Sequence, residues 1–325
     1  PGKFACFTKT GSHFLYVGLE EVIYGESTSY NTVRSFKPKG GCSYAIFDKF
    51  ETKICITNYE SIQIYDLTGN LLCRTENPGK SQSLLWCVNN TLWAACWLGT
   101  LQVYDWSEQN SLLLSKTLPE VHTNFLTLRM SYDERVVLTG GEEGLIKMWD
   151  SRSVEVLFTF RGHEGYVNDI RFTVDPNLFV SSGDDSTIRV WRWQISQNEE
   201  HAKIVADIDE DIKHVEISPS GDKISIFGAD TTAIEGICLS SRTAFPSIPI
   251  YSDQPTGSIL MTQFSSDGSY IFALNEHGSV FKGHLASQKI EREFTSSDAG
   301  AVNFIWASPF SEKLIFGYPS GDLQI

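Results

Sequence analysis

A pattern of about 40 residues that recurs along the chain constrains the fold more than any other feature of this sequence. It is clearest in 162–191, GHEGYVNDIRFTVDPNLFVSSGDDSTIRVW, which opens on a Gly-His pair and closes on tryptophan. Apolar and polar residues alternate over 166–172 and again over 187–191, the period of half-buried β-strands. The turn-forming runs DPN and GDDS separate these segments from a third apolar run at 178–181. The sequence therefore predicts a three-stranded antiparallel meander here.

Equivalent repeats occupy the rest of the chain. The third strand of five successive repeats ends on an aromatic residue, with spacings of 41, 39, 45 and 42 residues: Tyr24, Tyr65, Tyr104, Trp149 and Trp191. Three more repeats begin near positions 212, 259 and 301, which makes eight in all. Strand-like runs between the repeats, such as Thr32–Phe36 and Glu155–Phe160, supply a fourth strand to each of the first seven.

Four-stranded sheets repeated in series are the blades of a β-propeller. We therefore predict an all-β fold with eight four-stranded blades. The last blade is expected to be incomplete, because its fourth strand falls at neither end of the sequence. A seven-bladed ring is the alternative. Since the chain starts with PGKFACF, we expect residues 1–325 to form a single propeller domain excised from a longer chain.

The central repeat resembles one repeat of the WD-repeat family, whose signature is a Gly-His pair followed by a Trp-Asp pair. The preceding repeat closes on Trp149-Asp150, whereas Trp191 is followed by Arg192 instead of aspartate. The resemblance implies a WD-repeat β-propeller, a fold that binds other proteins on its faces.

The resemblance also implies a structural role for four residues of the central repeat. They include the residue types of a Ser-His-Asp triad, but in WD-repeat proteins these positions form a hydrogen-bond network that joins the strands of a blade: His163, Ser181, Asp185 and Trp191. The preceding repeat has a second copy with glutamate in place of aspartate: His122, Thr139, Glu143 and Trp149. Two copies at matching positions favour scaffold chemistry, so we expect no catalytic residues and no enzyme.

Charge and composition restrict the partners. The 26 Lys and Arg residues against 40 Asp and Glu residues give a net charge of −14, which disfavours direct binding to nucleic acid and suits a basic protein partner. No apolar run approaches the 18 or so residues of a membrane span, so we expect no membrane contact.

Cysteine and histidine spacing gives no sign of a metal site. The seven cysteines include no C-x-x-C pair, and the seven histidines are scattered. Most of the cysteines lie in apolar runs, which predicts buried, reduced thiols in an intracellular protein, nuclear or cytoplasmic. No dinucleotide or phosphate-binding fingerprint is complete. We therefore expect no cofactor and no metal.

By the same resemblance, a partner binds on the top face, near the start of each first strand and at the turn between the second and third strands. The resemblance assigns to this face the residues Tyr166, Asn168 and Asp184 of the fifth repeat, Phe125, Thr127 and Glu142 of the fourth, Asp211 and Lys213 of the sixth, and Leu260 and Glu276 of the seventh. Aromatic anchors beside carboxylates suit a peptide that carries Arg or Lys. The expected function is a non-catalytic scaffold within a multiprotein complex.

The sequence Trp149-Asp150-Ser151-Arg152 supports an alternative function. In some WD-repeat proteins a W-D-x-R sequence marks docking onto the propeller adaptor of cullin-type ubiquitin ligases. The guanidinium of Arg152 would make the contact, because its fork of N–H donors matches carboxylates and carbonyls. On this reading the chain is a substrate receptor.

Overall fold

The computed structural model describes most of the chain and consists almost entirely of antiparallel sheets. The described residues are 4–8, 12–18, 21–26, 32–193, 202–207, 212–228, 233–239, 243–250, 257–294, 302, 304–307, 314–318 and 323–324. They form two compact units, an N-terminal unit of residues 1–159 and a C-terminal unit of residues 160–325.

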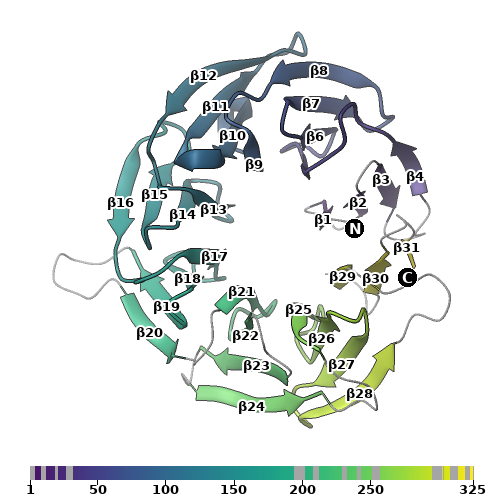
Figure 1. Cartoon of the computed structure of the whole chain (residues 1–325), viewed down its shortest axis with the longest axis vertical. Helices are drawn as coiled ribbons and strands as arrows, with labels where there is room; N and C mark the ends of the chain where they lie inside the picture. Colours follow the sequence, from purple (N-terminus) through teal and green to yellow (C-terminus); the bar gives the residue numbers. More distant parts are fainter. Residues whose placement is uncertain are drawn as a thin grey trace. The chain divides into compact units, whose positions relative to one another are not determined.

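The N-terminal unit contains four sheets of four strands, and the strands of each sheet lie in chain order (Figure 1). Sheet one contains β1 Phe4–Phe7, β2 His13–Val17, β3 Val22–Glu26 and β4 Thr32–Phe36. Sheet two contains β5 Tyr44–Phe47, β6 Lys53–Thr57, β7 Ser61–Asp66 and β8 Leu71–Glu76. Sheet three contains β9 Ser81–Trp86, β10 Thr91–Cys96, β11 Leu101–Trp106 and β12 Leu112–Leu118, with short 3-10 helices η1 Val88–Asn90 and η2 Trp97–Gly99 in its turns. Sheet four contains β13 Phe125–Met130, β14 Val136–Gly141, β15 Ile146–Asp150 and β16 Val156–Phe160.

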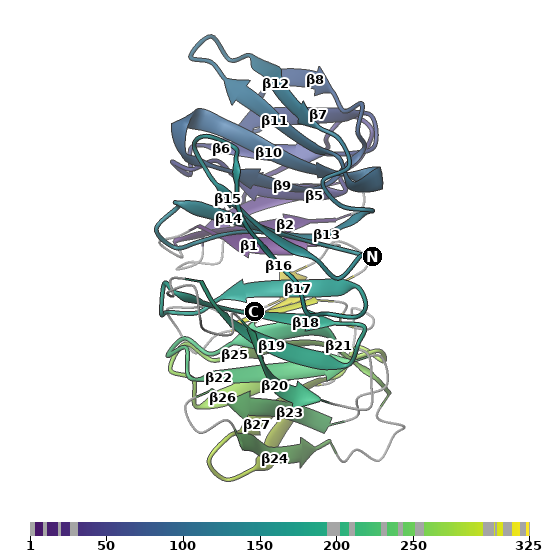
Figure 2. The same cartoon turned by 90° about the vertical axis from the view of Figure 1, so that its left-hand side faces the viewer.

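The C-terminal unit continues the series with three four-stranded sheets and a final three-stranded one. Sheet five contains β17 Val167–Phe172, β18 Leu178–Gly183, β19 Thr187–Arg192 and β20 Ala202–Asp207, which Figure 2 shows side by side. Sheet six contains β21 Ile212–Ile217, β22 Lys223–Gly228, β23 Ala233–Cys238 and β24 Thr243–Pro249. Sheet seven contains β25 Ile259–Phe264, β26 Tyr270–Asn275, β27 Val280–His284 and β28 Lys289–Phe294. Sheet eight contains β29 Phe304–Ala307, β30 Leu314–Gly317 and β31 Leu323–Gln324.

This architecture confirms the predicted all-β fold and its eight repeats, of which the last has three strands among the described residues. The five aromatic residues that define the repeat period lie on the third strands of sheets one to five. All five are buried, with exposed fractions between 1% and 5%: Tyr24, Tyr65, Tyr104, Trp149 and Trp191. The period in the sequence is therefore the spacing of successive buried anchors.

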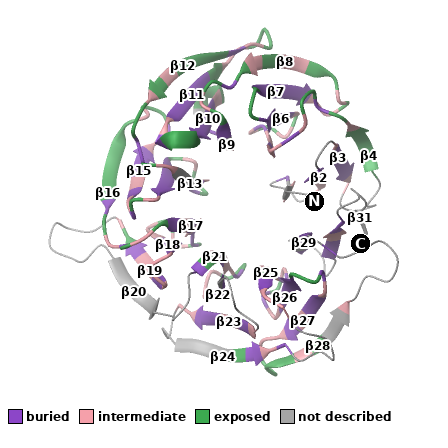
Figure 3. Cartoon of the chain, in the orientation of Figure 1, coloured by how far each residue is buried: buried purple, intermediate pink, exposed green. Residues whose placement is uncertain are grey.

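Apolar side chains between consecutive sheets form the core. Within the N-terminal unit, one cluster joins sheets one and two, another joins sheets two and three, and a third joins sheets three and four around Trp93 and Trp149. The C-terminal unit has three equivalent clusters. The outermost strands β8, β12 and β16 are mostly exposed, as Figure 3 shows. Burial therefore falls from the middle strands of a sheet to its outer strand.

All seven cysteines are free thiols, four of them buried. Burial raises the pKa of Cys96 to about 12, so this thiol remains protonated at neutral pH. Within the part of the chain that the structure describes, no helix has the length and apolar character needed to cross a membrane.

The core predicts a strong effect for one substitution. Trp93 is fully buried, and its ring packs edge-to-face on Trp149 with centroids 6.3 Å apart. Trp93→Ala should lower the free energy of unfolding by about 3–5 kcal/mol, because it leaves a large cavity between sheets three and four. Leu113→Ala is the control: Leu113 is 63% exposed on β12 and should change stability by less than about 0.5 kcal/mol. Urea denaturation measures both, and equal effects would contradict this description of the core.

Candidate functional site

A continuous hydrogen-bond chain crosses sheet five. The indole Nε1 of Trp191 donates to Ser181 Oγ at 2.8 Å, and this hydroxyl lies 2.6 Å from His163 Nε2. His163 Nδ1 in turn lies 2.8 Å from Asp185 Oδ1. One set of protons satisfies every contact: Ser181 donates to a neutral imidazole, and the imidazole donates to the carboxylate. The structure therefore joins the four residues predicted from the sequence into one network.

Asp185 ends this chain and organises the turn between β18 and β19. The backbone N–H of Glu164 donates to its Oδ2 at 3.0 Å, and the hydroxyl of Thr187 donates to its Oδ1 at 2.8 Å. Burial opposes ionisation of Asp185, but the N–H of Glu164 and the imidazole of His163 hold its pKa below the ordinary value. For His163 itself, burial lowers the pKa and outweighs the opposite effect of Asp185. The network therefore pairs an ionised carboxylate with a neutral imidazole.

Two glycines allow the histidine of each network to approach the backbone. A Cβ atom on Gly183 would lie 2.6 Å from His163 Nδ1, and a Cβ on Gly141 would lie 2.5 Å from His122 Nδ1. Both distances are shorter than real Cβ contacts, so only glycine fits before the two acidic residues of each turn.

Sheet four repeats the network. Trp149 Nε1 donates to Thr139 Oγ1 at 3.0 Å, Thr139 Oγ1 lies 2.8 Å from His122 Nε2, and His122 Nδ1 contacts Glu143. Burial opposes ionisation of Glu143 too, yet His122 and the N–H of Thr123 keep the pKa of Glu143 lowered.

Burial argues against a catalytic role for this constellation. Ser181 is fully buried, and Trp191, which is 1% exposed, occupies one side of its hydroxyl. A nucleophile must reach the carbon it attacks. Among the described residues, the hydroxyl of Ser181 has hydrogen bonds with the indole and the imidazole alone. The chemistry it performs is cross-linking of strands.

Sheets two and three anchor their tyrosines in a different way, which the sequence reading missed. Ile56 and Ala94 occupy the strand positions of Thr139 and Ser181, so neither can accept a hydrogen bond from an anchor. Instead each tyrosine hydroxyl donates to a glutamine two residues earlier on its own strand: Tyr65 to Gln63 at 2.6 Å and Tyr104 to Gln102 at 2.9 Å. The signal was present in the sequence as the recurring Gln-x-Tyr triplet.

Four residues at the edge of sheets five and six form a surface group that we name the Asp184 cluster: Tyr166, Asn168, Asp184 and Lys213. Asn168 Nδ2 donates to Asp184 Oδ1 at 2.6 Å and to the carbonyl of Ile212 at 2.8 Å. Lys213 Nζ forms an ion pair with the same Oδ1 at 2.7 Å. Tyr166, 45% exposed, joins them through its backbone carbonyl, which accepts the N–H of Asp184 at 2.9 Å. The three fifth-repeat residues predicted for the top face are thus brought together, with the Lys213 of the sixth.

The corresponding assignments in sheet four need a correction. Phe125 pairs with Gly141 just as Val167 pairs with Gly183, and a bulge follows each pair. The residue that matches Tyr166 is therefore Asn124, and its Nδ2 donates to Glu142 at 3.1 Å.

Thr127 matches the inward-facing Asp169 and is 3% exposed, so it offers no surface contact. The side chain of Phe125 and the whole of Asp211 lie outside the described residues. Leu260, 50% exposed, and Glu276 lie at the surface of sheet seven.

The W-D-x-R segment forms a tight turn after β15. Asp150 Oδ1 accepts the backbone N–H groups of Arg152 at 2.9 Å and Ser153 at 2.8 Å, and these bonds lower the pKa of Asp150. Trp149 is buried, whereas Arg152 is exposed. Of Trp149, Asp150 and Arg152, only Arg152 is an exposed residue with a long side chain.

A charged group on the first strands of sheets five and six was not predicted. We name it the Asp169 network: Asp169, Arg171, His214 and Glu216. His214 Nδ1 lies 2.8 Å from Asp169 Oδ2, which also pairs with Arg171 Nε at 3.2 Å. Burial disfavours the imidazolium, but Asp169 and Glu216 together raise the pKa of His214. Among the described residues, no three His, Cys, Asp or Glu side chains converge as metal ligands would.

Comparisons with known proteins place these features in context. Residues 114–150 and 154–192 each match the family described as WD domain, G-beta repeat. Human pre-mRNA-processing factor 17 is 26% identical over 192 residues, which cover 56% of this chain and 31% of that protein. GID complex subunit 7 of Schizosaccharomyces pombe is 42% identical over 60 residues, 18% of this chain and 12% of that protein. The match thus spans less than a third of either relative.

Among solved structures, Chaetomium thermophilum Sqt1 bound to the N-terminus of the ribosomal protein L10 superposes with a TM-score of 0.74. The alignment covers 94% of this chain and 91% of Sqt1 at 13% identity, which shows a shared β-propeller fold. The family match over 114–150 includes the hydrogen-bond network of sheet four, and the match over 154–192 includes that of sheet five.

The two histidines predict opposite dependences on pH. The folded-state pKa of His163 lies below its unfolded value of about 6.5. The stabilisation that neutral His163 adds to the free energy of unfolding is therefore complete above that pH and is lost as the pH falls. The pKa of His214 is raised in the folded state. The stabilisation that protonated His214 adds to the free energy of unfolding is therefore complete below about pH 6.5 and is lost as the pH rises through the folded-state pKa.

The measurement is urea denaturation of wild type, His163→Gln and His214→Gln at roughly pH 7.5 and 5.5, on either side of the ordinary histidine pKa. On acidification the wild type's advantage over His163→Gln should shrink, and its advantage over His214→Gln should grow. One proton limits each change to about 1.4 kcal/mol per pH unit. Changes in the same direction would contradict these protonation states.

Proposed function

Because this chain is a WD-repeat β-propeller, we propose that it is a non-catalytic scaffold of an intracellular multiprotein complex and binds a basic segment of a partner protein at the Asp184 cluster. The observation that carries the proposal is the surface carboxylate of Asp184, which Asn168 holds in place, next in the structure to the exposed residue Tyr166, whose backbone carbonyl accepts the N–H of Asp184 at 2.9 Å. The contacts that the structure gives to this carboxylate, from Asn168 and Lys213, both go to Oδ1. The second carboxylate oxygen, Oδ2, is suited to a guanidinium or ammonium group of the partner.

The surroundings of Asp184 support a peptide ligand. Asn168 fixes the carboxylate from one side, which reduces the entropy lost on binding. Tyr166 provides a flat aromatic surface for the stem or the charge of a basic side chain. The net charge of −14 favours approach of a basic partner. The structural similarity to Sqt1, which was solved with a peptide terminus of a ribosomal protein, is consistent with this class of ligand.

Binding at the Asp184 cluster is tested by a double substitution. Tyr166→Ala/Asp184→Ala should weaken capture of the partner at least about tenfold, since it removes an aromatic anchor and its charge partner. Affinity purification with mass spectrometry identifies the proteins lost, and a synthetic peptide from the basic segment of each is then titrated by calorimetry. Glu155→Gln, an exposed carboxylate before β16, is the control and should retain the partner.

Two results of this experiment would contradict binding at the Asp184 cluster. If the double variant retains every protein captured by wild type, or if no lost protein has a basic segment that binds wild type alone, the Asp184 cluster is not the docking surface.

The second candidate function, a substrate receptor of a cullin-type ubiquitin ligase, is favoured by the exposure of Arg152. Asp150 holds the backbone N–H groups of the turn, which fixes the point from which the Arg152 side chain extends. The segment Trp149-Asp150-Ser151-Arg152 would then be the docking element.

Two substitutions at Arg152 test this function. Arg152→Ala should abolish recovery of a cullin ligase, and Arg152→Lys should reduce it strongly because an ammonium lacks the planar fork of donors. Recovery is measured by immunoblotting for the cullin after purification of the chain. Unchanged recovery with Arg152→Ala would exclude docking through this segment.

A further inference from the structure

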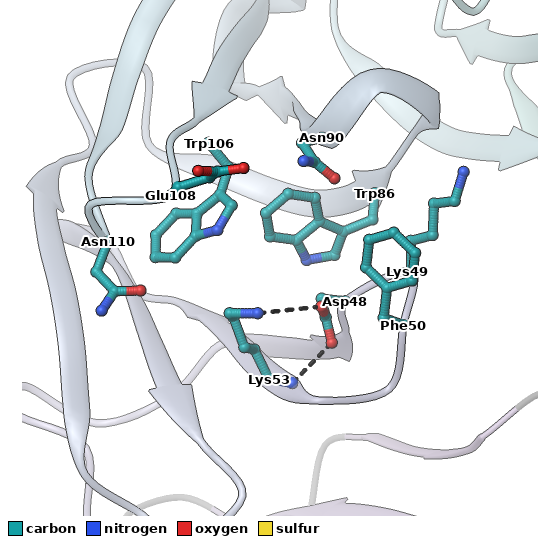
Figure 4. Close-up of a pocket in the computed structure, with 9 residues that line it drawn as sticks. All are labelled: Asp48, Lys49, Phe50, Lys53, Trp86, Asn90, Trp106, Glu108 and Asn110. Carbon is teal, nitrogen blue, oxygen red and sulfur yellow. Dashed lines mark hydrogen bonds and ion pairs between the residues drawn. The ribbon is translucent and has the colours of Figure 1, made fainter.

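A pocket of about 280 Å³ lies in the N-terminal unit, between loops of sheets two and three (Figure 4). The loop between β5 and β6 supplies Asp48 and Phe50, and the first residue of β6 is Lys53. The last residues of β9 and β11 supply Trp86 and Trp106. Lys49 and the exposed residues Asn90, Glu108 and Asn110 complete the lining. Neither the repeat anchors nor the Asp184 cluster contributes to this pocket, which we name the Trp86 pocket.

The indole N–H of Trp86 is a buried donor without an acceptor. Trp86 is 6% exposed, and its Nε1 has no hydrogen-bond partner among the described residues. Figure 4 shows this edge of the indole turned toward the side of the pocket that holds Asp48 and Lys53. Trp93 Nε1 also has no acceptor in the part of the chain that the structure describes, but Trp93 lies in the closed core and lines no part of this pocket. An unmet buried donor costs stability, which a ligand oxygen can restore.

Asp48 does not accept the N–H of Trp86, because groups of Thr52 and Lys53 already donate to its carboxylate. The backbone N–H groups of Thr52 and Lys53 donate to its Oδ1 at 2.6 and 2.7 Å, and the hydroxyl of Thr52 donates to Oδ2 at 3.1 Å. The carboxylate thus holds the loop in shape and is itself 6% exposed.

Lys53 supplies a second donor to the same space. Its Nζ lies 3.1 Å from Thr52 Oγ1, 3.7 Å from Asp48 Oδ2 and 5.9 Å from the centre of the Trp106 ring. An ammonium group has three N–H donors, and only the contact with Thr52 is short enough for a hydrogen bond. A guest oxygen that meets both Lys53 and Trp86 would be charge-assisted, which favours a carboxylate.

The remaining walls suit apolar groups next to that carboxylate. Trp86 and Trp106 pack edge-to-face with centroids 6.4 Å apart, and Phe50 is 63% exposed at the side of the pocket. Glu108 opposes an anion at the rim, whereas Asn90 and Asn110 offer amide donors. The net charge of −14 is spread over the whole surface and is screened beyond about 8 Å at physiological salt. Local donors therefore decide the preference.

We propose that the Trp86 pocket binds an acidic side chain of a partner protein, an Asp or Glu with apolar neighbours. The carboxylate accepts hydrogen bonds from Trp86 Nε1 and Lys53 Nζ, and the apolar neighbours pack on Trp106 and Phe50. This is a second binding surface, opposite in charge preference to the Asp184 cluster and independent of it.

The test follows the indole N–H of Trp86 by NMR in the full chain labelled with nitrogen-15. Trp86→Phe identifies its resonance among the eight tryptophans. The probe is the peptide acetyl-Gly-Leu-Glu-Leu-Gly-amide, and the matched controls carry Gln or Lys in place of Glu. The Glu peptide should shift this resonance downfield in a saturable way, and the Lys peptide should leave it unmoved.

Variants identify the groups responsible. Lys53→Met should weaken binding of the Glu peptide about tenfold because it removes a charge-assisted donor. Glu108→Gln should tighten binding about twofold by removing a like charge. Asp184→Asn should change nothing, which separates this pocket from the proposed top-face function.

Three results would overturn the proposal: no saturable shift with the Glu peptide, an equal shift with the Lys peptide, or weaker binding of the Glu peptide by Glu108→Gln. The last two would identify a site for cations. Lys53 and Glu108 both lie at the pocket surface, so these outcomes remain decisive even where Trp86→Phe impairs folding.

Discussion

The hydrogen bond at the tip of the buried tyrosine or tryptophan on the third strand is the constraint on which sheets two to five depend. A tyrosine or tryptophan supplies the apolar area that joins one sheet to the next, but its O–H or N–H must find an acceptor once water is excluded. Trp149 and Trp191 use a hydroxyl on the neighbouring strand, held by histidine and an acidic residue. Tyr65 and Tyr104 use a glutamine on their own strand. Both solutions satisfy the same requirement.

This difference explains why only part of the chain matches the family pattern. The histidine-based solution needs residues from four separate places in a repeat, and it therefore leaves a long sequence signature, which lies within 114–150 and 154–192. The glutamine-based solution needs only a Gln-x-Tyr triplet, which carries little sequence information. Sheets with the same architecture thus differ in how readily their repeats are recognised.

The fold was predictable because the spacing of the buried aromatics depends on strand and turn lengths alone. The positions of side chains at the surface could be predicted less well from the sequence. The strand pairing matches Phe125 with Val167, one position away from the Tyr166 of the sequence assignment, so Thr127 is buried like Asp169. The Asp169 network joins residues of two repeats, 169 and 214, and nothing in either strand specifies its neighbour. The Trp86 pocket draws on loops from two sheets and has no linear pattern at all.

Asp184 and Asp185 are adjacent in the chain, yet their carboxylates face different environments. Asp185 is tied to a buried imidazole and to two backbone N–H groups, while Asp184 contacts side chains at the surface. The turn between β18 and β19 thus divides its two acidic residues into one that maintains the sheet and one that is presented outward. Position 184 can change over evolution, or by design, with little cost to folding, whereas position 185 is held fixed by its neighbours. A repeat built in this way can acquire new surface contacts while it keeps the hydrogen bonds that maintain its sheet.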